Sequence, residues 1–359
     1  MKNSKVYDRP IKPFPEYVQK DITYKLHTLL LALLRPTITP SILQPNILNL
    51  SEEDWTRLFT LAAQHGVTAL LFDTILRLPE QQQPSRALKI RWALSSEAIE
   101  KRHAQQTRAA HELTTLFASH GVRTILLKGL GLSIYYPRPE HRECGDIDLW
   151  LDNCDKGNRL IEELGIKINY DSEKHAVFHY KGVMVENHSH LLMPSHRRTE
   201  RAIDDFLVGE AENSRLAPAG YYTPSPMFNA LYLLRHMARH FGTEGINLRH
   251  LLDWGLFLRS EQSEIDFEKI LTLYAATGYD TVYNIFTALA GELLDEAICA
   301  VHSDSYHIRN AALLVIRKYM QHSEEHAFQV CRLVEGMADS TLEGEQMLYN
   351  MVKEELAVD

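Results

Sequence analysis

The sequence is poor in cysteine, contains no long apolar run and has no excess of positive charge. The four cysteines, Cys144, Cys154, Cys299 and Cys331, show no CxxC spacing, a pattern typical of free thiols in a reducing compartment. No apolar stretch reaches the roughly 18 residues that a membrane-spanning helix needs. The net charge of -9 argues against binding of long nucleic acid through its phosphates. We therefore expect a cytoplasmic protein that contacts neither a membrane nor extended nucleic acid.

The hydrophobic pattern changes twice along the 359 residues. Residues 1–120 are predicted to form an N-terminal helical region, 121–220 an α/β core and 221–359 a C-terminal helical region. In the first region, Asp21 can cap a helix that we expect to end before Pro36, since proline interrupts helical hydrogen bonding.

Two further helices are expected in the N-terminal region. Ser51 and Asp54 have the spacing of a capping box, so a helix should begin there and end near Gly66. A long helical pattern runs from Ala87 to His120 and is followed by a glycine, a favourable residue after a helix.

The middle region contains short apolar segments that are typical of strands. Residues 122–127 form an apolar, β-branched run, a short helical stretch follows up to Tyr136, and residues 147–151 form a second strand. Residues 176–180 and 183–186 flank Lys181-Gly182, which suits a hairpin turn. A loop region follows before helical spacing resumes at Met227.

Asp146 and Asp148 stand two residues apart in the second of these apolar segments. Alternate residues of a strand face the same side, so both carboxylates should point into one space. Two like charges that close are unfavourable unless a cation neutralises them, and Mg²⁺ binds carboxylate oxygens. The alternative is an edge strand whose two exposed aspartates cap nearby turns.

Gly129 and Gly131 follow the first predicted strand directly. Glycines between a strand and a helix let backbone N–H groups approach a phosphate, and Lys128 can add a positive charge. The alternative is a tight turn without a ligand.

These segments together resemble a known family. The matching segments are Leu126-Leu127-Lys128-Gly129, Tyr135-Tyr136-Pro137, Arg142 and Gly145-Asp146-Ile147-Asp148-Leu149. They are similar to the poorly characterised nucleotidyltransferase family of the polymerase-β-like superfamily, as are flanking residues between about 50 and 260. The resemblance implies an α+β fold, with a small mixed-sheet nucleotidyltransferase core flanked by N-terminal and C-terminal helical regions. It further implies transfer of an NMP from an NTP with Mg²⁺ (or Mn²⁺). The wider superfamily has Gly-Ser or Gly-Gly where this chain has Lys128-Gly129.

The resemblance also implies a third carboxylate on a later strand, and Glu186 fits this position. In that scheme Asp146 and Asp148 bind the metals, Glu186 completes the catalytic metal site, and Lys128 and Arg142 neutralise phosphates. The alternative for Glu186 is an exposed residue at a strand end.

Several histidines are further candidates for ligand binding. His236 and His240 share one helical face beside arginines, which could bind the triphosphate or the acceptor. Zinc binding and simple packing are the alternatives. His188 follows Glu186 and is a candidate cofactor-binding residue; together with His190 and His196 it forms either a set of loop and strand-edge histidines or a metal cage. Asp253 could bind the acceptor or form a helix-surface ion pair with Arg249.

We therefore expect a metal-dependent nucleotidyltransferase that acts on an unidentified small-molecule or protein acceptor. A catalytically silent nucleotide-binding or regulatory module and a metal-dependent hydrolase are the alternatives. The sequence names neither the nucleotide nor the acceptor.

Overall fold

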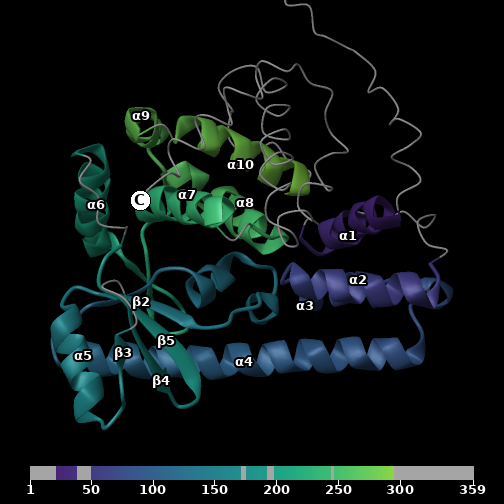
Figure 1. Cartoon of the computed structure of the whole chain (residues 1–359), viewed down its shortest axis with the longest axis horizontal. Coiled ribbons are helices and arrows are strands. Elements are labelled where there is room, and N and C mark those ends of the chain that lie inside the picture. Colours follow the sequence, from purple (N-terminus) through teal and green to yellow (C-terminus); the bar gives the residue numbers. More distant parts are fainter. Residues whose placement is uncertain are drawn as a thin grey trace, which may run out of the picture.

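The chain forms an α+β fold, as predicted. The computed structural model describes residues 22–38, 50–170, 175–191, 198–243, 246–277 and 279–294. These residues contain ten α-helices, a five-stranded mixed sheet and a two-stranded ribbon (Figure 1). No helix among them combines the length and the hydropathy that a bilayer crossing requires. The Asp21 cap and the helical pattern expected after residue 294 lie outside the described residues.

Three helices form the N-terminal part: α1 (Ile22–Ile38), α2 (Glu52–Gln64) and α3 (Thr68–Ile75). The capping box at the start of α2 is confirmed, because the Ser51 side chain accepts from Asp54 N and the Asp54 side chain accepts from Ser51 N.

The predicted end of α1 before Pro36 is wrong, since Pro36 lies inside the helix. The helix continues only two residues further, and tertiary contacts hold this last turn. Thr37 Oγ1 donates to Leu70 O of α3 at 2.9 Å, and Arg77 Nη1 donates to Pro36 O at 3.0 Å. Packing against α3 thus overrides the helix-breaking preference of proline.

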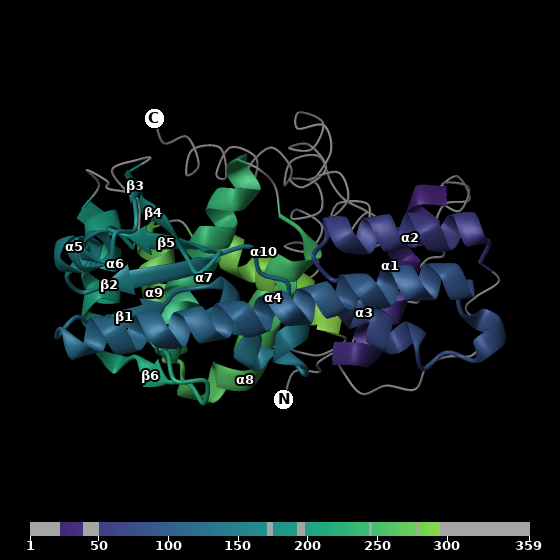
Figure 2. The same ribbon diagram turned by 90° about the horizontal axis from the view of Figure 1, so that it is seen from below.

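Helix α4 (Arg86–Ser119) is 34 residues long, which corresponds to about 50 Å. It runs along one side of the molecule, from α2 and α3 at one end to the sheet at the other (Figures 1 and 2). Trp92 packs in the core of the N-terminal helices, and Leu113 and Phe117 pack under the sheet. The predicted helix is therefore confirmed, and it connects both parts of the molecule.

The main sheet has the strand order β1-β2-β5-β4-β3. The strands are β1 (Thr124–Leu126), β2 (Ile147–Leu151), β3 (Asn169–Tyr170), β4 (His175–Tyr180) and β5 (Val183–His188). Strand β2 pairs antiparallel with β1 and parallel with β5. The predicted hairpin joins β4 and β5, and both residues of its turn have positive φ, 50° at Lys181 and 81° at Gly182. A two-residue turn of this kind matches the twist of the strands.

The side chains of β2 alternate between the two faces of the sheet. Ile147, Leu149 and Leu151 pack with α4 and α5 (Cys154–Glu163) in one hydrophobic cluster. Trp150 belongs to a second cluster with α7 (Pro226–Thr243) and α8 (Leu248–Glu261) on the other face. Because side chains alternate along a strand, Asp148 shares the face of Trp150 and points toward α7 and α8.

The remaining helices are α6 (Arg198–Glu210), α9 (Phe267–Thr277) and α10 (Asp280–Leu294). Helix α6 was not predicted, although Ile203 and Leu207 recur at helical spacing and are buried. One hydrophobic cluster joins α1–α3 with α7, α8 and α10. The N-terminal and C-terminal helical regions therefore share a core, and the division into three regions stays a prediction.

Candidate active site

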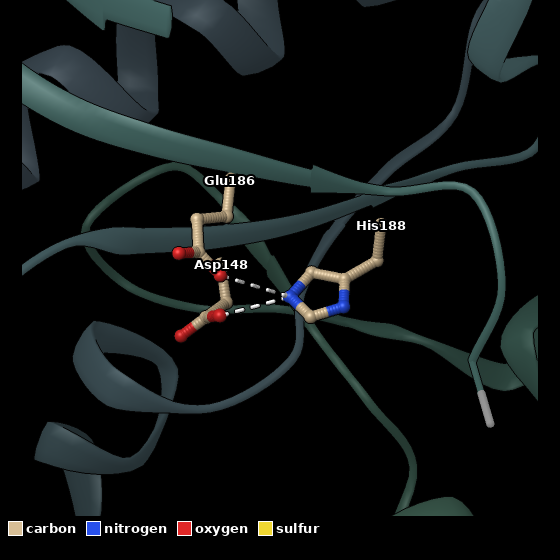
Figure 3. Close-up of side chains that lie close together, drawn as sticks. All are labelled: Asp148, Glu186 and His188. Atoms are coloured by element: carbon tan, nitrogen blue, oxygen red, sulfur yellow. Dashed lines mark hydrogen bonds and ion pairs between the residues drawn. The ribbon is translucent and has the colours of Figure 1, made fainter. Parts of the chain in front are cut away.

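Asp148 and Glu186 lie side by side on neighbouring parallel strands. The register of β2 and β5 pairs Asp148 with Glu186, so both side chains face α7 and α8. His188 lies two residues further along β5 on the same face. One ligand atom from each of the three side chains lies within 4.8 Å of the others (Figure 3). Strand β2, which carries Asp148, pairs with β1 and with β5, and β5 is the later strand on which Glu186 was expected.

Asp148 is buried and holds two polar partners on one oxygen. Its Oδ1 accepts from Lys128 Nζ at 2.8 Å and from His188 Nε2 at 2.9 Å. Burial alone would raise the pKa of Asp148, but the Lys128 charge and the His188 hydrogen bond lower this pKa far below its usual range. Burial likewise opposes a charge on Lys128, and the Asp148 charge nevertheless raises the Lys128 pKa above its usual value. The two residues therefore form a buried ion pair.

Asp146 precedes β2 by one residue and is partly buried beside Asp148. Burial and repulsion by Asp148 raise the pKa of Asp146 from 3.8 to about 6. The Asp146 carbonyl accepts from Cys144 Sγ at 2.9 Å and from Gln106 Nε2 of α4 at 3.5 Å. The backbone thus holds the Asp146 carboxylate at a place where a negative charge is unfavourable. A bound cation would neutralise this charge.

The two glycines after β1 are required for different reasons. Gly129 has φ +56°, and a Cβ there would lie 2.8 Å from Cys144 Sγ and 3.6 Å from Asp148 Oδ2. A Cβ on Gly131 would lie 2.7 Å from Leu126 O, and the Gly131 N–H donates to Lys128 O at 2.9 Å. Close packing against β1 therefore explains the glycine at position 131. The glycine at position 129 has positive φ and leaves space beside Cys144 and the Asp148 carboxylate.

A cavity of about 460 Å³ opens between these carboxylates and helices α7 and α8. Asp146, Asp148, Lys128 and Gly129 line one side of it. Its volume lies in the range of small-molecule sites. Asp148 belongs both to the cavity wall and to the group with Glu186 and His188.

Histidines line the opposite side of the cavity. The ring centres of His236 and His240 are 4.4 Å apart, and those of His240 and His250 are 5.4 Å apart. Burial and the Lys128 charge hold the pKa of His236 well below its usual value, and burial and Arg249 lower the pKa of His250 to about 3. His236 and His250 are therefore neutral at physiological pH, which removes His236 from the basic face that the sequence suggested.

Phosphate binding by the arginines of this helix face and zinc binding by its histidines were the other hypotheses. The Arg235 guanidinium lies 4.6 Å from the ring centre of Tyr279. In the part of the chain that the structure describes, the group with metal-ligand geometry is Asp148, Glu186 and His188, rather than His236 and His240.

Arg142 lines the cavity, but Asp253 of α8 binds its guanidinium. Arg142 Nε donates to Asp253 Oδ1 at 3.1 Å, and Nη2 donates to Oδ2 at 2.6 Å. Tyr136 Oη also donates to Asp253 Oδ1, at 2.7 Å. All three side chains are buried. The possible surface ion pair between Arg249 and Asp253 is wrong, because Asp253 is buried and Arg249 Nη1 donates instead to Glu143 O at 3.0 Å.

Other elements hold the residues on either side of Arg142. His141 Nδ1 lies 2.7 Å from Asp73 Oδ2 of α3, and His141 Nε2 lies 2.8 Å from Glu100 Oε1 of α4. Glu143 Oε1 accepts from Thr68 N, at the start of α3, at 2.8 Å.

The segment leading to Asp146 is therefore fixed by α3, α4 and α8. Sequence reasoning missed His141 and Glu143 because their partners are distant in sequence.

Comparison with known proteins identifies the family. Residues 51–295 match the model of a family described as uncharacterised nucleotidyltransferase, which is more than half of the chain. The match includes the sheet, the acidic residues and helices α7 and α8. No curated protein and no solved structure matches the chain. The chain belongs to the uncharacterised nucleotidyltransferase family.

Proposed function

We propose that this protein transfers an NMP from an NTP to a hydroxyl, phosphate or amine of an acceptor, with a divalent metal bound by Asp146, Asp148 and Glu186. The observation that carries the proposal is the in-register pair of Asp148 and Glu186 on parallel strands, next to a cavity that Asp146 also lines. Membership of a nucleotidyltransferase family supports the reaction class.

The residues suit a divalent cation such as Mg²⁺ or Mn²⁺. Oxygens of Asp148 and Glu186 already lie close together, and burial together with the Asp148 charge raises the pKa of Asp146. Hard divalent cations bind carboxylate oxygens together with substrate phosphates. When bound, the metal supplies electrophilic activation of the phosphate and charge neutralisation for in-line transfer.

The chain itself orients the substrate in this proposal. Lys128 lies at the carboxylate side of the cavity and offers a positive charge to the triphosphate, and the Gly129 backbone lets it approach closely. Arg142 is paired with Asp253, so we assign to it mainly the positioning of the segment before Asp146. The side of the cavity near His236 and His250 then accommodates the nucleoside or the acceptor.

A transfer assay tests the proposal. Purified protein is incubated with each of the four α-labelled NTPs, Mg²⁺ or Mn²⁺, and fractionated small-molecule or protein acceptors. We expect label transfer with pyrophosphate release, lost in Asp148→Asn and retained in the matched control Asp155→Asn, an exposed aspartate in the first turn of α5.

The alternatives give different results in the same assay. Metal-dependent NTP binding without any labelled product supports a silent binding module. NTP hydrolysis without an acceptor, abolished by Asp148→Asn, supports a hydrolase. Activity that is equal in Asp148→Asn and the wild type overturns the proposed site.

A further inference from the structure

His188 brings a nitrogen donor to the two carboxylates. Its Nε2 lies 2.9 Å from Asp148 Oδ1 and 3.9 Å from Glu186 Oε2 (Figure 3). The strand register holds it there, since β5 pairs His188 with Trp150 of β2. The side chain is only 7% exposed. The imidazole is therefore buried and held in a fixed position beside the two carboxylates.

A nitrogen donor changes which metals the group prefers. Mg²⁺ binds oxygen ligands almost exclusively and retains several waters. Imidazole suits later first-row ions, and carboxylates suit both Mg²⁺ and Mn²⁺. A set of two carboxylates and one imidazole therefore favours Mn²⁺ over Mg²⁺, because Mn²⁺ accepts both donor types.

Without a metal, the protonated Nε2 of His188 donates to Asp148. Coordination needs the Nε2 lone pair, so the neutral ring would carry its proton on Nδ1 instead.

Lys128 Nζ contacts the same Asp148 oxygen, at 2.8 Å. A metal at this oxygen would repel the ammonium, which borders the cavity. Lys128 would then turn toward the triphosphate, so metal binding and phosphate binding would support each other.

Resting on the function proposed above, we propose that His188 is a direct nitrogen ligand of the metal at Asp148 and Glu186, and that it makes this site selective for Mn²⁺ over Mg²⁺.

Metal binding to the full chain, without nucleotide, tests this assignment. Free Mn²⁺ is followed by electron paramagnetic resonance during titration, and Mg²⁺ competition gives the selectivity ratio. His188→Gln places an amide oxygen near the position of Nε2. We expect this variant to lower the Mn²⁺/Mg²⁺ ratio on the order of tenfold or more. His190→Gln, at an exposed position on the same segment, should keep the wild-type ratio.

A second measurement does not depend on a variant that folds. Pulsed electron paramagnetic resonance of Mn²⁺ bound to the wild type should show coupling to a directly bound ¹⁴N nucleus. Absence of this coupling, or an unchanged ratio in a folded His188→Gln, overturns the assignment while the proposed transfer activity stands. Mn²⁺ binding that survives Asp148→Asn at wild-type strength would instead overturn the proposed metal site itself.

Discussion

Removal of the Asp253 carboxylate should strongly destabilise the protein. Asp253→Ala leaves the buried Arg142 guanidinium without its bidentate partner and Tyr136 Oη without an acceptor. Breaking a buried ion pair by removing one partner costs about 3–5 kcal/mol, because the remaining charge stays buried and uncompensated. Tyr136→Phe removes only one neutral donor and should cost about 1 kcal/mol.

An exposed ion pair of the same length is the control. Lys101 Nζ and Glu97 Oε1 on α4 are 2.6 Å apart, as are Arg142 Nη2 and Asp253 Oδ2, but both side chains of the α4 pair are more than half exposed. Glu97→Ala should therefore cost no more than about 0.5 kcal/mol. Burial of the ion pair, rather than its length, explains the expected difference in the loss of stability.

Urea unfolding of the variants gives the free energies. The double variant Arg142→Met/Asp253→Leu should be more stable than Asp253→Ala alone, because it leaves no unpaired buried charge. A loss below about 1 kcal/mol in Asp253→Ala, similar to that of the exposed pair, would refute the reasoning.

Three further substitutions test the carboxylate side of the cavity. The Asp146 carboxyl keeps its proton up to about pH 6 when folded but only to about pH 3.8 when unfolded, so its deprotonation disfavours folding as pH rises through this window. Asp146→Asn should therefore stabilise the metal-free protein by up to about 3 kcal/mol above pH 7 and by little below pH 4; a destabilised variant at pH 7 would contradict this. Lys128→Met should strengthen binding of Mn²⁺ alone but weaken NTP binding by about 2 kcal/mol, measured by titration calorimetry, and unchanged NTP affinity would make the lysine structural. Gly129→Ala should lower stability more than Gly165→Ala, since both glycines have positive φ but only the first would press a Cβ on Cys144 Sγ; equal losses in thermal unfolding would argue against the clash.

Local signals in the sequence predicted much of the fold. The α2 capping box, the α4 periodicity and the turn at Lys181-Gly182 each depend on residues close in sequence, and the structure contains all three. Helix α1 differs because contacts with α3 hold Pro36 inside its last turn. Such contacts join residues more than thirty positions apart, and no local pattern encodes them.

The candidate site likewise combines residues that could be predicted from the sequence with contacts that could not. The apolar segment pointed to Asp148 and the family resemblance pointed to Glu186, and these two residues lie together on paired strands. The partner of Arg142 was not predictable, because Asp253 lies 111 residues later and pairing it with Arg249 satisfied the helix spacing equally well. The neutrality of His236 likewise follows from burial, which the sequence of one helix does not reveal.

The anchoring of the segment before Asp146 has a consequence for biosynthesis. A ribosome makes the chain from the N-terminus, so α3, α4 and both strands that carry Asp148 and Glu186 emerge before α8. Domains generally fold during synthesis as their residues become available. Asp253 is therefore synthesised 111 residues after Arg142, and only then can it neutralise the positive charge of Arg142. A nascent chain that ends before α8 already contains Lys128, His188 and both carboxylate strands, but it lacks Asp253, which anchors Arg142 in the segment before Asp146.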